Sequence, residues 1–151
     1  MEALLTAIVA DLETNLTYLE WVGVIEHEGL IPASPQFPMI GVIEGGYAAQ
    51  SLPGKKDLET LNVGVVAYQQ IILTEPGAAI MGSTAQLGDA GKGLLAIGAD
   101  IKARLNDNVL AVAKIHYAHL ERAQPSRPIA DPNGEVIAMY KRFDFIYRRY
   151  V

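Results

Sequence analysis

The chain contains no cysteine, which excludes disulfide bonds, thiolate zinc sites and a thiol nucleophile. No stretch approaches the roughly 18 uninterrupted apolar residues that a membrane helix requires. The first residues also lack the basic segment and small-residue cleavage pattern of a signal peptide. We therefore expect a protein of the cell interior that contacts no membrane and folds without covalent cross-links.

Positive charge is scarce as well. Twelve Lys and Arg residues face 17 Asp and Glu residues, for a formal net charge of -5. This balance disfavours a dedicated nucleic-acid binder, which needs a positive field to displace counterions from phosphates. Hydrophobic residues make up 50% of the 151 residues, a mixture typical of a packed globule. The length is that of one domain, and we expect a single domain spanning residues 1–151.

Nucleotide-binding and hydrolase motifs are incomplete or missing. The glycine-rich segment 88–93 is superficially like a phosphate loop, but that motif needs a glycine five residues before its Gly-Lys pair and a Ser or Thr after it. Gln86 and Gly93 hold those places. No Gly-x-Ser-x-Gly sequence occurs either. We interpret 88–93 as the glycine-rich start of a helix and expect no cofactor.

Two pairs of titratable residues remain as candidates for chemistry. His116 and His119 lie three residues apart on an expected strand, so their side chains should point to opposite faces and cannot grip one metal ion together. At an interface, their charge could make association sensitive to pH. Glu26 and Glu28 share one face of another expected strand, as a carboxylate pair for acid–base catalysis would, but nothing in the sequence supplies a matching pocket. A small enzyme or ligand-binding domain built from scattered residues such as His27, Glu28 and His116 stays open as an alternative.

Two amphipathic helices are predicted from apolar residues that recur at steps of three and four. The first spans 2–16, with a core face of Leu5, Ile8, Val9, Leu12 and Leu16. The second has a core stripe of Leu87, Ala90, Leu94, Ile97, Ile101 and Leu105, and ends at 106–108. Its glycines lower helix propensity. Tertiary packing must therefore hold this helix, and we expect it to lie close to a sheet.

Strands are predicted at 18–26, 39–44 and 57–73, with a long loop at 45–56. Pro32, Pro35 and Pro38 should keep the segment between the first two strands extended and outside the sheet. The 57–73 stretch would extend roughly 55 Å if it were fully regular, far beyond the usual strand. We expect part of it to leave its own domain. The loop 74–84 should expose the trio Ala79-Ile80-Met81.

The last third of the chain predicts a long β-hairpin, with strands at 109–123 and 135–151 around the turn residues 130–134, where Asp-Pro-Asn-Gly favours a reversal. On the last strand, Ile137, Met139, Phe143, Phe145 and Tyr147 share one face, and Tyr140, Arg142, Asp144, Arg148 and Tyr150 share the other. The predicted fold is α+β: a mixed or antiparallel sheet with two amphipathic helices packed on it and a long C-terminal hairpin.

The clearest candidate for a functional surface is the basic cluster Lys141-Arg142 and Arg148-Arg149 with tyrosines between its members. Arg and Tyr are favoured at protein interfaces. Stacking aromatics beside cations would also suit single-stranded nucleic acid, although the acidic total argues against it. The interface candidates are Tyr47, Leu52, Lys55, Lys56, Ile80, Met81, Tyr140, Arg142, Arg148, Arg149 and Tyr150.

The order of elements resembles that of bacteriophage tail terminators, which close the top of a long tail tube. The resemblance is carried by an N-terminal helix, strands of the kind at 22–25 and 39–43, a long strand, a second helix, and a hairpin ending at 143–147. It covers nearly the whole chain but is one of layout, because the family has no short diagnostic motif, and no site residues carry over.

The resemblance implies a structural virion protein rather than an enzyme. Such a subunit forms a hexameric ring on the tail tube protein, and the other side of the ring receives the neck or head-completion proteins. The protein would occur in the host cytoplasm during assembly and in the virion afterwards. DNA would only pass through the lumen, where an acidic wall limits sticking. The loop 45–56 and the strand after it would serve as arms between subunits. Another neck component is the close alternative.

Overall fold

The computed structural model describes residues 1–31, 35–84 and 91–151, which form an α+β fold around one mixed six-stranded sheet. The strands are β1 (Trp21–Val24), β2 (Met39–Leu52), β3 (Lys56–Gln70), β4 (Ile115–Ala123), β5 (Arg127–Ala130) and β6 (Val136–Tyr150). Their order is β1-β2-β3-β6-β4, with β5 also beside β6. Only the β1–β2 pair is parallel within this described sheet. The predicted fold class is therefore confirmed.

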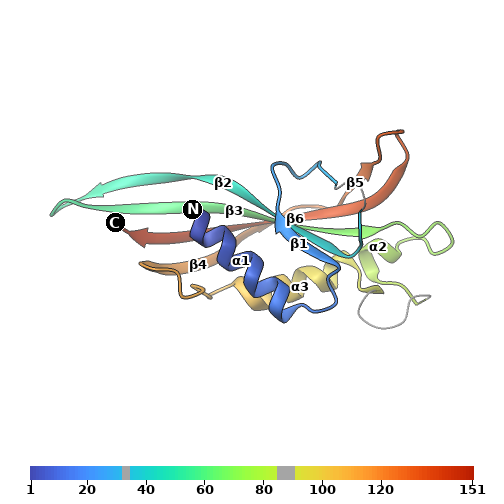
Figure 1. Cartoon of the computed structure of the whole chain (residues 1–151), viewed down its shortest axis with the longest axis horizontal. Helices are drawn as coiled ribbons and strands as arrows, with labels where there is room; N and C mark the ends of the chain where they lie inside the picture. The colour runs from blue at the N-terminus through green and yellow to red at the C-terminus, as the bar shows by residue number, and fades with distance from the viewer. Residues whose placement is uncertain (32–34, 85–90) are drawn as a thin grey trace.

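Three helices occur in the described part of the chain, one more than predicted: α1 (Glu2–Asn15), α2 (Ala78–Met81) and α3 (Leu94–Leu105). α1 and α3 lie side by side on one face of the sheet (Figure 1). They bury Leu4, Ile8, Leu12, Leu94, Ile97, Ile101 and Leu105 against that face. The shared core is therefore on the helix side of the central strands.

The predicted stripe of the second helix is confirmed at its four positions from Leu94 onward, while Leu87 and Ala90 lie outside the described residues. In α1 the buried face includes Leu4, and Leu5 and Val9 are only half-buried, so the predicted face was rotated slightly. Hydrophobic periodicity located both helices because each packs a single stripe against the sheet.

α3 lies close to the sheet at Gly98, as its glycines predicted. A Cβ atom at this position would overlap the buried Phe143 ring of β6, with Cε1 at 2.8 Å. Gly93, just before α3, faces a different neighbour, the backbone of Ile80 and Gly82 at the end of α2. Missing side chains at these two positions thus let α3 approach both β6 and α2.

The opposite face of the sheet is covered over part of its length by the segment that follows β1. The buried residues there are Ile25, Met39, Ile43, Val66, Tyr68, Ile129 and Ala138. The Tyr68 hydroxyl donates a 2.6 Å hydrogen bond to the backbone carbonyl of Glu28, which fastens this segment to β3. Pro32 lies outside the described residues. This second core ends near the middle of β3.

The prediction of a loop at 45–56 was wrong. β2 continues to Leu52, and a bulge between Glu44 and Tyr47 interrupts its pairing with β3. A short turn with positive φ at Gly54 and Lys55 then joins the two strands. The small and polar residues in this part of β2 are exposed, so they show no alternation that could reveal a strand. Backbone pairing with β3 forms it instead.

Other predicted boundaries also moved. The strand expected at 109–123 begins only at Ile115, because Leu110, Ala111 and Lys114 have positive φ. The strand expected at 18–26 shortens to β1, and the one expected at 57–73 ends at Gln70. Glu26 and Glu28 therefore lie beyond β1 and do not form a pair on a strand.

The turn at 130–134 is confirmed between β5 and β6. The Gly134 amide donates to the Asp131 carbonyl at 3.0 Å, and Gly134 has a positive φ. The strand β5 itself was not predicted. Because β4 and β5 both pair with β6, the expected hairpin has a long strand on one side and two shorter strands on the other.

Candidate functional site

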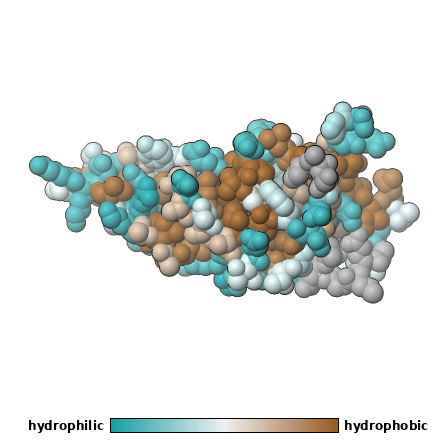
Figure 2. Space-filling model, viewed as in Figure 1, coloured by the Kyte–Doolittle hydropathy of each residue, from teal (hydrophilic) through white to brown (hydrophobic). Residues whose placement is uncertain are grey.

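The sheet extends beyond its helices as a four-stranded antiparallel region, which we call the distal sheet. It comprises residues 44–52 of β2, 56–63 of β3, 115–123 of β4 and 143–150 of β6. Figure 1 shows the β2–β3 turn projecting past the start of α1. Figure 2 shows mainly hydrophilic residues at this narrow end and apolar residues over the middle of the molecule.

Both outer strands of the distal sheet have a neighbour on one side only. β1 pairs with β2 no farther than Val42, so in the described structure residues 44–52 pair with β3 alone. β4 pairs with β6 alone among the described strands. The edge at 44–52 therefore offers a row of backbone amide and carbonyl groups to a further strand, and the β4 edge does so only outside its middle. The middle of the β4 edge is already occupied, because the Ala118 carbonyl accepts a 3.0 Å hydrogen bond from the Asp107 amide and the Leu120 amide donates a 2.8 Å hydrogen bond to Asn106 Oδ1.

The two faces of the distal sheet differ in charge. On the helix side, Glu59 forms an ion pair with Arg149 at 2.7 Å. The other face, which we call the open face, consists of Ala48, Gln50, Leu52, Lys56, Leu58, Thr60, His116, Tyr117, His119, Ile146, Arg148 and Tyr150. Strand alternation places Asp57 and Glu59 on the helix side. Asp144 also belongs to the open face, at its inner end, where it accepts a 2.7 Å hydrogen bond from Arg142.

Aromatic side chains from β4 and β6 contact one another on the open face. The His116 and Tyr150 rings stack with centroids 4.5 Å apart and an interplanar angle of 7°. The Arg148 guanidinium lies 4.8 Å from the Tyr117 ring centroid, and the His119 ring lies 6.0 Å from Tyr117. Rings and cation thus form a cluster of two neighbouring groups, His116 with Tyr150 and Tyr117 with Arg148 and His119.

A β-bulge explains why both histidines belong to this cluster. The pairing of β4 with β6 shifts between Ile115 and Tyr117, so His116 is an extra residue in its strand. The prediction that His116 and His119 point to opposite faces assumed a regular strand and was wrong. Among the described residues, no group of three or more His, Asp or Glu is placed to hold a metal ion.

A shallow hollow lies at the end of the open face. Lys56, Lys114, His116, Tyr150 and Val151 line it, and its volume is about 480 Å³. In the described structure neither lysine forms an ion pair. The hollow therefore combines two free ammonium groups with a stacked aromatic pair.

The structure separates the predicted interface residues into several groups. Leu52, Lys55, Lys56, Arg148 and Tyr150 belong to the distal sheet or its turn. Tyr47 also lies there, 66% exposed but on the helix side. Met81 is 77% exposed and Ile80 is half-buried, and both belong to α2, at the opposite end of the molecule (Figure 1). Ala79 is buried, so the predicted exposure of the 79–81 trio was wrong at its first residue.

Three of the four cations in the predicted basic cluster make contacts within the subunit, since Arg149 pairs with Glu59 and Lys141 and Arg142 are also engaged. Arg142 donates to Asp144 at 2.7 Å and lies 3.6 Å from a carboxylate oxygen of Glu28. Burial by itself would lower the pKa of Arg142, but these two carboxylates outweigh it and raise the pKa. Lys141 donates to the Gln124 carbonyl at 2.7 Å. These cations are already engaged within the subunit.

Two of the three tyrosines in the cluster are also part of the core. Tyr147 is completely buried, and burial raises the pKa of its hydroxyl above the usual range. That hydroxyl has no hydrogen-bond partner within the described structure. Tyr140 is half-buried with its ring 5.9 Å from that of Tyr68. Only Tyr150 is exposed.

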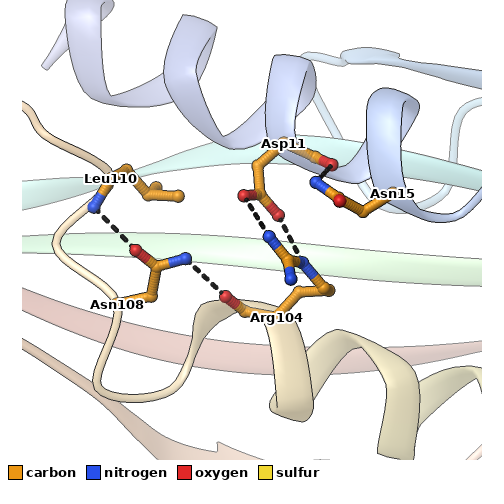
Figure 3. A network of polar contacts seen from close by, with 5 residues as sticks. All are labelled: Asp11, Asn15, Arg104, Asn108 and Leu110. Atoms are coloured by element: carbon orange, nitrogen blue, oxygen red, sulfur yellow. Dashed lines mark hydrogen bonds and ion pairs between the residues drawn. The ribbon is translucent and has the colours of Figure 1, made fainter.

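Polar contacts between the helices were not predicted and serve the fold. Figure 3 shows the Arg104 guanidinium of α3 gripping the Asp11 carboxylate of α1 through bonds of 3.1 and 2.9 Å. The Asn108 side chain bridges the Arg104 carbonyl and the Leu110 amide, which ends α3 (Figure 3). Asp11 and Arg104 are 93 residues apart in the sequence, so no local pattern predicts their contact.

The residues considered for nucleotide binding and for an enzyme do not form a site. Residues 88–90 of the glycine-rich segment lie outside the described residues, and Lys92 pairs with Asp100 at 2.8 Å. His27 accepts a hydrogen bond from the Gly29 amide, and no described contact joins it or Glu28 to His116. The distal sheet remains the best candidate for a functional region.

Comparison with known proteins does not identify the chain. No protein-family model matches the sequence, and no curated protein matches it. In the described residues no helix has the length and apolarity needed to cross a membrane. The geometry of the distal sheet is therefore the basis on which we infer a function.

Proposed function

We propose that this chain is a structural subunit that assembles into a ring through the edges of its distal sheet, as a tail terminator of a long-tailed phage. The observation that carries the proposal is that, in the described structure, residues 44–52 on one side and the two ends of β4 on the other lack a strand partner along their outer edge. Unpaired edges are templates for a strand of another chain. The role is structural and requires no cofactor.

Strand direction favours a head-to-tail arrangement. Residues 44–52 run toward the β2–β3 turn, and β4 runs away from it, since each successive pair from β2 to β4 is antiparallel. A neighbouring copy rotated about an axis along the strands would therefore place its β2 antiparallel to β4. Contacts between two different surfaces close into rings when the rotation permits.

Charge also differs between the two edges. Exposed Glu20, Glu26 and Glu44 lie beside or on the β1–β2 edge. Exposed Lys114, Arg122 and Arg127 lie beside or on the β4–β5 edge, with Glu121 as an opposing charge. Opposite charges across an interface fix its register and suppress wrong pairings. By the strand register Glu44 is level with Leu120, so copies placed edge to edge without a shift would bring Glu44 within two residues of Arg122.

In this proposal the ring is a hexamer that sits on the tail tube protein and receives neck or head-completion proteins on its other side. These partners follow from the resemblance in layout. Another neck component remains the second candidate, since unpaired edges support any ring of this kind. A tail terminator should cap purified tail tubes, whereas another neck component should not.

A charge exchange tests the edge pairing. We expect Glu44→Arg and Arg122→Glu each to reduce the oligomer mass measured by light scattering, because each places like charges at the joint. The double variant should restore the oligomer. Glu13→Arg with Lys102→Glu, exposed on the helices, is the matched control and should change nothing.

Electron microscopy then tests the ring and its partner. Negative-stain images of the protein alone should show rings, and images of its mixture with tail tubes should show capped tubes. A strict monomer at all concentrations, with uncapped tubes, would refute the proposal. Restoration of the oligomer without any capping would support a different neck component.

A further inference from the structure

Positive charge is concentrated on the open face, although the chain as a whole is acidic. The chain carries 17 acidic residues, yet among the residues that the strand register assigns to the open face only Asp144 is acidic, and it is paired with Arg142 at 2.7 Å. Lys56 and Arg148 lie on this face, and Lys114 lines the hollow at its end. In the described structure these three cations form no ion pair. A protein with a net charge of -5 thus holds a local cationic surface.

The aromatic rings on the same face are accessible. Tyr150 is 49% exposed and Tyr117 is 36% exposed, and both histidines are exposed. Ring centroids 4.5 Å apart in one pair and 6.0 Å apart in the other place the rings in two neighbouring pairs, which together form an aromatic row on β4 and β6. Rings of this kind offer π faces on which unpaired bases stack, whatever their sequence.

The hollow fits the size of one nucleotide. Its volume of about 480 Å³ lies within the range of small-ligand sites, and it sits where Lys56 and Lys114 meet the His116–Tyr150 stack. Ammonium groups bind phosphate as point charges, while the aromatic pair lies beside them. Phosphate and base could therefore be contacted together.

We propose that the open face binds single-stranded nucleic acid, with Lys56, Lys114 and Arg148 contacting phosphates and the aromatic row stacking bases. An acidic protein segment would satisfy the cations but would leave the exposed rings without a matching group. The proposal does not rest on ring assembly, because Lys56, Arg148 and Tyr150 project from the face and away from the edge groups; only Lys114 also lies beside the β4 edge.

Fluorescence anisotropy with a labelled oligothymidine measures this binding. Three phosphate contacts predict a log–log salt slope of about -2, so raising salt from about 50 to 200 mM should weaken binding roughly 20-fold. Lys56→Gln with Lys114→Gln should lower affinity and reduce the slope to about -0.7. Tyr150→Ala should weaken binding roughly tenfold with the slope unchanged.

Control variants distinguish binding at the open face from nonspecific attraction between cations and phosphates. Lys102→Gln with Arg127→Gln removes two exposed cations elsewhere and should bind like the wild type. Thermal unfolding checks that each variant is folded. The Glu44→Arg variant shows whether oligothymidine binding survives when the ring joint is broken. The proposal is wrong if binding does not saturate or if both double variants behave alike. It is also wrong if duplex DNA binds as tightly, or if polyglutamate competes as well as the oligonucleotide, which would indicate an acidic protein partner.

Discussion

Replacing Gly93 with alanine tests the close approach of α3 to α2. Gly93 has φ -77° and ψ 167°, a conformation that alanine adopts without strain. A Cβ atom would nevertheless overlap the Ile80 carbonyl oxygen and the Gly82 amide nitrogen, and would lie 2.5 Å from the Ile80 carbonyl carbon. Backbone atoms cannot rotate away as a side-chain tip can. The substitution therefore isolates packing from backbone freedom.

The expected magnitude follows from two opposing effects. Loss of unfolded-state entropy would favour alanine by about 0.4–1 kcal/mol. Overpacking a filled site costs about 1–3 kcal/mol, and a backbone obstacle favours the upper end. We expect a net loss of about 2 kcal/mol, equivalent to a fall in Tm of about 4–8 °C for a chain of this size.

Urea and thermal unfolding followed by circular dichroism measure the change. Gly29→Ala is the control, because its Cβ would meet only the exposed His27 ring, at 3.1 Å, and should change stability by less than about 0.5 kcal/mol. A Gly93→Ala variant as stable as the wild type would refute the close backbone approach.

Three further substitutions test the core and the polar contacts of α3. Ile97→Ala, at a fully buried position, should cost about 2–5 kcal/mol in urea unfolding, and a smaller loss would mean that the core is not packed as described. Asp100→Asn should destabilise at neutral pH: burial raises the pKa of Asp100, but the hydrogen bonds from Lys92 and a tyrosine outweigh it and lower the pKa. That stabilisation is present above about pH 4 and is lost as the pH falls through the lowered pKa. The Tm values of the wild type and of Asp100→Asn should therefore converge in acid. A difference in Tm that stays constant with pH would contradict this. Arg104→Gln should lower Tm, and adding Asp11→Asn should lower it less than additively; full additivity would show that the pair does not interact.

The elements that the sequence predicted well are those with a periodic or local signal. α3 buries one stripe of residues at helical spacing, and the pattern reported it from Leu94 to Leu105. The turn before β6 needs residues that accept its backbone angles, and Asp-Pro-Asn-Gly supplies them. The second half of β3 was also visible as a strand, because burial of both of its faces gives it a run of apolar residues.

The parts that escaped prediction depend on contacts between distant residues. Residues 45–52 are small, polar and exposed, and only pairing with β3 makes them a strand. The bulge at His116 reverses the expected direction of one histidine, and no residue type signals it. Arg142 and Arg148 looked equivalent in sequence, yet one is held by Asp144 and the other lies exposed on the open face.

The sequence by itself determined the α+β class, the two long helices, the last turn, and the absence of cysteine chemistry and of a complete nucleotide motif. These properties follow from composition and short-range periodicity. Only the tertiary structure decided which strand edges stay unpaired, which cations are free, and which aromatic rings meet on the open face. Those properties depend on strand register and bulges, which long-range packing sets and no local pattern records.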